Sequence, residues 1–591
     1  MALDEEQSGA AHEMRRAIDC LRDCADLAHV DAATLDALAA GAVHFSLPAG
    51  SSLFESGSAP DGVYLVASGR LGVKTQGMAR LTAEIERSEL VGEAGWLLKE
   101  ERSATVFALR DSEMLLIPNA VLDAVAAQST HFALAVAQLC ARRLRRSNRQ
   151  EASHKRARIF AVVPNSIEID IATLATRLVA EFARAGRTEL VWDARASAHT
   201  AGWFNAIEER NDCVVYVADP SSSGWTRQCC RQADVILLAA PAAAAAKPWP
   251  NGVAEAVARG ARVELALLHD GAVEPGAAAR WLQTSPVALH HHLVEAADLS
   301  RLARLLTQRG VGLVLSGGGA RGFAHLGVIR ALREARVPID FVGGSSIGSI
   351  IAAGVAMGWS DEEMRLRYRR SFVDTNPVND YTFPFVALTR GRKVSRLLQR
   401  EYGEVSIEDL RQPFFCVSAN LSTGRVLKHR EGRVADALRA SVAIPGVMPP
   451  VYRGEDVLVD GAAINNLPVD IMRAHAPGLV IGSDVGADRF ALGGGKRRIN
   501  IFQILMHAGM VNNASSAEAQ RQLADVLLKP PLANVDLLNW RAFDRAIQAG
   551  YDYAQRAIEA LPALPRLLVA TERPARSSLV AEMERRLAAS T

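Results

Sequence analysis

Residues 311–326 read VGLVLSGGGARGFAHL, and residues 341–348 read FVGGSSIG. In each stretch a short apolar run leads into small residues, and apolar residues at helical spacing follow. A buried strand that turns sharply into a helix has this pattern. Two such units in succession predict a parallel sheet covered by helices. Apolar runs at 414–419 and 479–484 extend the predicted sheet, whereas the end of the chain reads as a loosely attached tail.

The first of these turns holds three consecutive glycines, Gly317, Gly318 and Gly319. Glycine lets the backbone turn sharply and present N–H groups without partners, and the start of a helix adds a partial positive charge. Such a turn can hold a phosphate or the oxyanion of an acyl transfer. Taken alone, it is equally typical of a tight turn that binds no ligand.

The second turn decides between these alternatives. It fits the pattern G-x-S-x-G, and only Ser346 has a glycine two residues away on both sides, at Gly344 and Gly348. This pattern is typical of a strained turn that exposes a nucleophilic serine. A phosphate-binding P-loop needs a lysine, which both turns lack. Ser346 is therefore the candidate nucleophile, and Ser345 reads as a packed neighbour.

A serine needs a base to take its proton. Asp460 follows the predicted strand 457–459 and precedes Gly461, a position from which a carboxylate often faces a site. An Asx-turn is the simpler interpretation of the Asp-Gly pair alone. His325 lies one turn into the first helix and reads as a packed residue. The other histidines of this segment lie in no supporting motif: His429, His475 and His507.

Over residues 311–485, the order, spacing and context of these motifs resemble the patatin-like phospholipases, in which a Ser–Asp dyad works without histidine. The resemblance implies that Ser346 is the nucleophile and Asp460 the base, and that the reaction passes through an acyl-serine. It also implies that Arg321 braces the glycine loop and adds positive charge there. The implied oxyanion hole is formed by the backbone N–H groups of three glycines: Gly317, Gly318 and Gly319.

The first 150 residues read as short strands separated by turns, which resemble the cyclic nucleotide-binding β-barrel. Gly92-Glu93 and Arg102-Ser103 stand at the spacing of that family. The resemblance implies that Glu93 accepts a hydrogen bond from a ribose hydroxyl and that Arg102 pairs with the cyclic phosphate. Ser103 and the backbone of Gly92 would complete a site for cyclic AMP or cyclic GMP. A barrel that keeps the fold without binding nucleotide is the alternative.

The part between, residues 157–305, alternates strands with helices and predicts a parallel α/β domain. Its first strand is followed by Val163-Pro164-Asn165-Ser166, which is no phosphate loop, so we expect a spacer or regulatory role. A patatin-like domain is expected over 308–570. The order of β-barrel, α/β middle domain and α/β patatin-like domain resembles the neuropathy target esterase group. We therefore expect a multidomain protein.

The composition of the chain indicates which kinds of binding partner and which cellular compartment to expect. The 591 residues include 67 basic and 65 acidic ones, a net charge of +2, which argues against a nucleic-acid partner. Seven scattered cysteines without zinc spacing indicate a reducing compartment and no metal site. No secretory signal and no long apolar run stand out. The basic stretch 142–158 reads as a linker or a contact with anionic lipid. We expect a cytoplasmic protein, peripheral at the inner face of the membrane.

Together these features predict a serine hydrolase of lipid esters, either a lysophospholipase or a phospholipase. We expect it to require no cofactor and to be regulated by a cyclic nucleotide. The alternative is a cyclic-nucleotide-sensing protein with a vestigial hydrolase domain. The apolar cluster Tyr381, Phe383, Pro384 and Phe385 is expected to anchor its loop in the core. Lining an acyl site and dipping into a membrane are the other interpretations of this cluster.

Overall fold

The structure is a computed structural model of the full chain. The expected C-terminal tail, Pro384 of the apolar cluster, His507 and part of the basic linker lie outside the described residues. The structure describes residues 14–15, 17–75, 81–148, 157–192, 201–220, 223–383, 385–475, 477–486 and 514–560.

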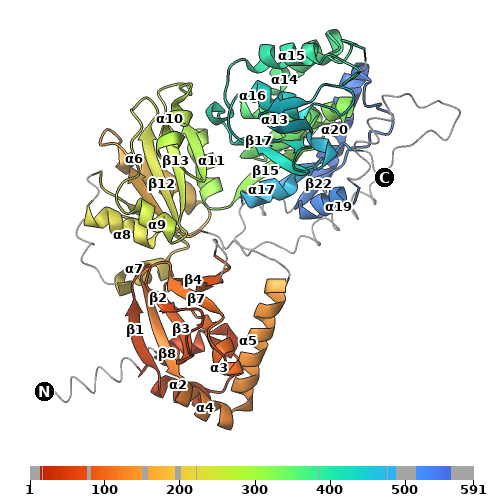
Figure 1. The fold of residues 1–591 in the computed structure, drawn as a ribbon. Coiled ribbons are helices and arrows are strands. Elements are labelled where there is room, and N and C mark those ends of the chain that lie inside the picture. The colour runs from red at the N-terminus through yellow and green to blue at the C-terminus, as the bar shows by residue number, and fades with distance from the viewer. Residues whose placement is uncertain are drawn as a thin grey trace. The chain divides into compact units, whose positions relative to one another are not determined.

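The N-terminal domain is built from two four-stranded antiparallel sheets (Figure 1), in the orders β1-β8-β3-β6 and β2-β7-β4-β5. Apolar side chains of both sheets share one core, for example Val66 and Met114 from one sheet and Leu71 and Val106 from the other. The strands are β1 (Val43–Leu47), β2 (Ser52–Phe54), β3 (Gly62–Ser68), β4 (Arg70–Thr75), β5 (Ala83–Glu86), β6 (Leu90–Val91), β7 (Ala104–Ala108) and β8 (Ser112–Pro118).

Residues 119–146 have helical periodicity, which predicts one long helix, but the structure divides this end of the domain into two helices. The structure has α4 (Asn119–Gln128) and α5 (Thr130–Asn148), bent by 117° with respect to each other. Ser129 between them is extended, and its hydroxyl accepts a hydrogen bond from the N–H of Phe132. The break arises because serine at a helix start satisfies an N–H group that a continuous helix would bond itself.

The middle domain carries a six-stranded sheet in the order β10-β11-β9-β12-β13-β14. The pairs β10–β11, β11–β9 and β9–β12 are parallel, as the alternation of strands and helices predicts. The strands are β9 (Ile159–Pro164), β10 (Thr188–Val191), β11 (Cys213–Val217), β12 (Val235–Pro241), β13 (Arg262–Leu268) and β14 (Leu289–Leu293). The helices include α6 (Ile171–Ala183), α7 (Ala201–Arg210), α8 (Gly224–Gln232), α9 (Val253–Ala258), α10 (Ala277–Thr284) and α11 (Ala296–Leu306).

The third domain holds an eight-stranded mixed sheet in the order β19-β20-β17-β16-β15-β21-β22, and β18 also pairs with β17. Its centre is parallel, whereas β18 and β20 run antiparallel to β17. The strands are β15 (Gly310–Leu315), β16 (Phe341–Ser345), β17 (Phe414–Asn420), β18 (Arg425–His429), β19 (Val451–Arg453), β20 (Asp456–Asp460), β21 (Gly478–Ser483) and β22 (Val526–Leu528).

Helices cover both faces of this sheet, so that the domain has three layers (Figure 1). Alternate strand residues face opposite layers: Leu313 joins the core with α12, α13 and α20, whereas Val314 joins the core with α17. The helices are α12 (Ala324–Glu334), α13 (Ile347–Ala356), α14 (Asp361–Tyr368), α15 (Arg392–Tyr402), α16 (Val434–Ser441), α17 (Val469–Ala474), α19 (Ala514–Leu523) and α20 (Phe543–Glu559).

This arrangement brings three strand ends together. The glycine turn follows β15, Ser346 follows β16, and Asp460 is the last residue of β20. β16 lies between β15 and β17, and β17 pairs with β20 so that Ser418 stands opposite Asp460. Among the described residues, no single helix has the length and apolar character needed to cross a membrane, although α4 and α5 meet that test as a bent pair.

Candidate active site

Ser346 occupies a strained turn between β16 and α13. Its φ is 53° and its ψ is −130°, a backbone conformation that residues other than glycine rarely adopt. The Ser346 N–H donates to the hydroxyl of Ser441, 3.1 Å away, which helps to hold the turn. Backbone strain of this kind persists only where the surrounding structure determines it, and it is common at reactive residues.

The two glycines of the G-x-S-x-G pattern are required by close packing. A Cβ atom on Gly348 would lie 2.4 Å from the carbonyl oxygen of Leu315 and 2.5 Å from that of Ser316. A Cβ atom on Gly344 would lie 2.7 Å from the same Leu315 oxygen. The start of α13 therefore lies directly against the end of β15, and only glycine permits this approach.

Asp460 lies within hydrogen-bonding distance of Ser346. The hydroxyl of Ser346 donates to Oδ2 of Asp460 over 2.6 Å. Oδ1 accepts from the N–H of Ala462, so the carboxylate also makes the Asx-turn that the sequence offered as an alternative. The N–H of Asp460 donates to the carbonyl of Ala443, which fixes the backbone. One oxygen thus orients the carboxylate, and the other contacts the serine.

Burial raises the pKa of Asp460 to about 6, against the opposing effect of its hydrogen bonds from Ser346 and Ala462. The side chain is almost fully enclosed, at 1% exposure. A carboxylate that titrates near neutrality accepts a proton far better than an exposed aspartate does.

The glycine turn lies against Ser346, but its first N–H group is already in use. A Cβ atom on Gly317 would lie 2.9 Å from that of Ser346. The Gly317 N–H donates to the side-chain oxygen of Asn466, 3.0 Å away, and the Asn466 amide donates back to the Gly317 carbonyl. Within the described residues, the N–H groups of Gly318 and Gly319 have no acceptor. The sequence treats all three glycines alike, whereas the structure separates Gly317 from the other two.

Sequence reasoning assigned no role to two residues that lie beside the site. Asn466 holds the glycine turn through its paired hydrogen bonds, and Ser441 holds Ser346. Residue type and spacing gave neither residue a role, because only tertiary contacts show what they touch. Arg321 donates from Nε to the carbonyl of Val535 over 2.7 Å, so it contacts backbone beyond the loop.

The two buried histidines nearest to this chemistry are bonded elsewhere. His325 contacts the hydroxyl of Ser483 and the carbonyl of Ser316, and burial lowers its pKa to about 4. His429 contacts the hydroxyl of Ser418, and burial likewise lowers its pKa to about 4. Within the part of the chain that the structure describes, neither histidine forms a hydrogen bond with Ser346 or Asp460.

In the N-terminal domain, the candidate phosphate ligand is enclosed. The guanidinium of Arg102 donates to Asp61 and to the carbonyls of Gly92 and Gly62, each over 2.8 Å, and it stacks on Phe54. Its Nε has no hydrogen-bond partner in the part of the chain that the structure describes. The expected anion position on this guanidinium is thus held by the carboxylate of Asp61.

The other candidate nucleotide ligands differ in their surroundings. Glu93 is buried at the start of α3 (Glu93–Leu98) and pairs with Arg143 over 2.6 Å. Gly92 has a φ of 86°, and a Cβ there would lie 2.3 Å from Arg102. Ser103 is exposed. The four residues are therefore close along the chain, but Glu93 and Arg102 already have partners within the protein.

Three family models match consecutive parts of the chain. They are the cyclic nucleotide-binding domain over residues 44–129, the Neuropathy Target Esterase family P-loop like domain over 157–309 and the patatin-like phospholipase over 313–473. An uncharacterized NTE family protein of Mycobacterium tuberculosis is 32% identical over 581 residues, which cover 92% of this chain and 97% of that protein. The chain belongs to the neuropathy target esterase family.

Longer relatives in the neuropathy target esterase family are covered only in part. The human patatin-like phospholipase domain-containing protein 6 is 28% identical, and the match covers 86% of this chain and 44% of that protein. Lysophospholipase NTE1 of Mycosarcoma maydis is 29% identical, with 74% of this chain and 28% of that protein covered. The expected family, the multidomain fold and the assignment as a patatin-like phospholipase are confirmed.

Solved structures match the N-terminal part of this family member. The regulatory domain of a Toxoplasma gondii protein kinase, titled as a complex with cAMP, has a TM-score of 0.21 and 16% identity, covering 23% of this chain and 52% of that one. The Thermus thermophilus catabolite activator protein has a TM-score of 0.20 and 26% identity, covering 27% and 68%. Such low scores add nothing about what the domain binds.

Proposed function

We propose that this chain hydrolyses carboxylic esters of phospholipids or lysophospholipids with Ser346 as nucleophile and Asp460 as base. The observation that carries the proposal is the 2.6 Å hydrogen bond between the Ser346 hydroxyl and Oδ2 of Asp460. The lipid substrate is supported by family membership and by relatives named lysophospholipase. The chain then acts where its substrate is, as a cytoplasmic protein peripheral at the inner face of the membrane.

The first half of the reaction forms an acyl-enzyme. Oγ of Ser346 attacks the ester carbonyl while Oδ2 of Asp460 accepts the hydroxyl proton. The tetrahedral intermediate then expels the alcohol, which takes that proton from Asp460. Since the pKa of Asp460 is about 6, the carboxylate is available at neutral pH and is still basic enough to accept a proton.

The second half of the reaction mirrors the first. Water attacks the acyl-serine, Asp460 accepts the water proton, and the proton returns to Oγ as the fatty acid leaves. No step requires a cofactor or a histidine. Because only ionised Asp460 accepts a proton, kcat/KM of a soluble ester is expected to rise as the pH rises through about 6 and to level off above it.

The N–H groups of Gly318 and Gly319 are the proposed donors to the oxyanion. Both lack an acceptor among the described residues, and they follow Gly317, which lies against Ser346. An oxyanion-hole donor is worth about 2.7–4 kcal/mol of transition-state stabilisation. Gly317 serves to position the loop through Asn466, and Arg321 braces its other end.

The test compares four full-length proteins on lysophosphatidylcholine and on a water-soluble short-chain ester. Ser346→Ala and Asp460→Asn are expected to lose activity on both substrates by about a thousandfold or more. Ser345→Ala is the matched control, because Ser345 is the buried neighbour and its hydroxyl has no hydrogen-bond partner among the described residues. Equal rates for wild type and Ser346→Ala on all esters would contradict the proposed hydrolase activity. They would favour the alternative, a cyclic-nucleotide-sensing protein with a vestigial hydrolase domain.

We also propose that a cyclic nucleotide regulates the chain through its N-terminal domain, with Glu93 toward the ribose and Arg102 toward the phosphate. The proposal is supported by the domain match and by the enclosed guanidinium of Arg102. Because Asp61 already pairs with Arg102, the phosphate has to displace this carboxylate. Calorimetry with cyclic AMP and cyclic GMP tests binding, and no heat at high concentration would leave a barrel that only keeps the fold.

A further inference from the structure

The loop before α15 exposes its apolar side chains, contrary to the expectation of a core anchor. We call Tyr381, Phe383, Phe385 and Val386 the aromatic loop. These side chains are 72%, 73%, 87% and 64% exposed. Phe383 and Phe385 contact each other, with ring centroids 4.8 Å apart. Contiguous exposed apolar groups are rare on soluble proteins and mark a surface that another apolar phase covers.

The exposure follows from how the loop closes on itself. Tyr381 forms an antiparallel bridge with Thr389, and the N–H of Thr382 donates to the carbonyl of Leu388. The residues that face the interior at the base of the loop are Ala387 and Thr389, both buried. The core position is thus filled by small side chains, and the aromatic ones are left on the outside of a loop held at its base.

The base of the loop is bonded to the segment that positions Asp460. The N–H groups of Leu388 and Thr389 donate to the carbonyls of Gly446 and Val447, each over 2.9 Å. Three residues before Gly446, the carbonyl of Ala443 accepts from the N–H of Asp460. The exposed apolar surface therefore belongs to the same small hydrogen-bonded unit as the candidate base.

Basic side chains follow the aromatic loop directly. Residues 380–396 hold four basic residues and one acidic residue, a net charge of +3. Arg390, Arg392 and Arg396 are exposed, and no ion pair joins them to another described residue. Lys393 is exposed as well and donates to the side-chain oxygen of Asn379.

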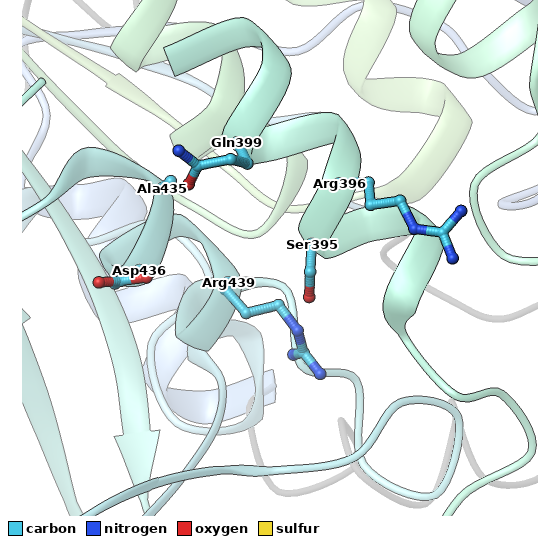
Figure 2. A pocket seen from close by; sticks show the side chains of 6 residues that line it. All are labelled: Ser395, Arg396, Gln399, Ala435, Asp436 and Arg439. Carbon is cyan, nitrogen blue, oxygen red and sulfur yellow. The ribbon is translucent and has the colours of Figure 1, made fainter. Parts of the chain in front are cut away.

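A cavity of about 290 Å³ lies between α15 and α16, and Arg439, a further basic residue, lines it. Figure 2 shows Arg439 of α16 facing Ser395 of α15, with Arg396 on the same helix as Ser395. Nη2 of Arg439 donates to the carbonyl of Pro449, but Nη1 is buried and has no acceptor within the described ranges. Asp436 lines the same cavity and Asp380 lies near Arg439, so two acidic residues balance Arg396 and Arg439 there, and the excess of positive charge comes from the residues that directly follow the aromatic loop.

We propose that the aromatic loop inserts into the surface of an anionic phospholipid bilayer while the basic residues of α15 and its N-terminal approach contact lipid phosphates. Aromatic rings are favoured at the depth of the head groups, and basic side chains are attracted to an anionic leaflet. Docking would place the candidate site beside the leaflet that holds its substrate. The inference rests on the proposed function for its substrate, but its binding step does not depend on hydrolysis.

The test measures vesicle binding of full-length Ser346→Ala, which leaves the lipid intact. Vesicles of phosphatidylcholine alone and of phosphatidylcholine mixed with phosphatidylglycerol are sedimented with the protein. Phe383→Ser with Phe385→Ser is expected to weaken binding to both by about tenfold or more. Arg392→Gln with Arg396→Gln is expected to weaken binding to the anionic vesicles about thirty-fold, because each basic side chain near such a surface contributes about a factor of five.

Matched controls lie far along the chain from the loop. Ile167→Ser removes an apolar side chain that is 81% exposed in the middle domain, and Arg177→Gln removes an exposed cation of α6. Both are expected to bind vesicles as the parent does. Unchanged binding of the loop and arginine variants would overturn the proposal, as would equal losses in the controls. A change in oligomeric mass without a change in vesicle binding would assign the loop to a second copy of the chain instead.

A second measurement separates failure of docking from failure of the hydrolase. With Ser346 present, the Phe383→Ser, Phe385→Ser protein is expected to keep its rate on a water-soluble ester and to lose rate on vesicle lipid about tenfold or more. Loss on both substrates would overturn docking as the role of the loop. Loop-dependent binding by a chain that hydrolyses no ester would contradict the proposed function while docking stands.

Discussion

Asp460 combines a buried position with a charge that the proposed reaction needs. Its pKa in the folded protein is about 6, whereas an aspartate in an unfolded chain titrates near about 3.9. Folding therefore favours the protonated form. The stability that this contributes is present in full below about pH 4 and is lost as the pH rises through about 6.

We expect Asp460→Asn to stabilise the folded protein at neutral pH, because the neutral amide carries no charge that burial penalises. The gain corresponds to on the order of 3 kcal/mol above pH 6 and shrinks as the pH falls toward 4. Thermal denaturation of variant and wild type at about pH 5 and about pH 8 measures the difference. A gain of equal size at both values would contradict the assigned pKa.

Asn466 offers a test of the glycine turn one residue at a time. Asn466→Ala removes both side-chain hydrogen bonds to Gly317 and leaves only the longer one, 3.3 Å, from the Gly317 N–H to the Asn466 backbone carbonyl. We expect it to lower kcat about 10- to 100-fold with little change in KM, because the proposed oxyanion donors lose their position. Asn465→Ala is the matched control, since Asn465 bonds to Asp470 instead. Loss of kcat in both variants, or a change confined to KM, would speak against a positioning role.

At the scale of elements, the contact between β15 and the start of α13 is closer than any side chain permits. Gly348→Ala would place a methyl group 2.4 Å from the Leu315 carbonyl oxygen, so strand and helix have to separate. We expect a loss of about 1–3 kcal/mol in stability together with loss of activity. Urea denaturation followed by activity and by circular dichroism measures both.

Gly224→Ala is the control for that substitution. Gly224 begins α8 in the middle domain, and a Cβ atom there meets nothing within 4 Å. We expect a change within about 0.5 kcal/mol and full activity. A loss for Gly224→Ala as large as that for Gly348→Ala would show that the close approach is not the cause.

At the scale of the whole molecule, the carboxylate of Asp61 occupies the position on Arg102 that we propose for the nucleotide phosphate. Asp61→Ala removes the carboxylate that holds Arg102 and is expected to tighten cyclic AMP binding about tenfold or more, because a paired guanidinium must otherwise give up its partner. Asp23→Ala, which removes an exposed partner of Arg87, is the control. Calorimetry of the full chain decides, and weaker binding after Asp61→Ala would contradict the competition.

The same two variants test regulation. If the nucleotide regulates hydrolysis, cyclic AMP changes kcat/KM at a lower concentration in Asp61→Ala than in wild type. The shift is expected to match the change in affinity, because regulation by a bound ligand cannot exceed its differential binding. Nucleotide binding without any effect on the rate of hydrolysis would contradict regulation, while leaving the domain as a nucleotide-binding one.

Local patterns were sufficient for the order of the three domains, for the serine turn and for Asp460 as a candidate. These features depend on short-range chemistry: glycines that permit a sharp turn, apolar runs that form buried strands, and a carboxylate at a strand end. Sequence reasoning went wrong at Ser129, where a local side-chain hydrogen bond divides a helix. It also went wrong at Phe383 and Phe385, where hydrophobic character alone suggested burial.

By itself, then, the sequence determined which residues could carry the chemistry, because residue type and spacing are local properties. Tertiary structure alone decided that Ser346 and Asp460 meet, since the two lie 114 residues apart and their contact depends on the order of strands in the sheet. It also decided that Gly317 bonds to Asn466 and that Arg102 is held by Asp61. A polar group in a buried site takes whichever partner the packing brings within reach, and no short motif records that choice.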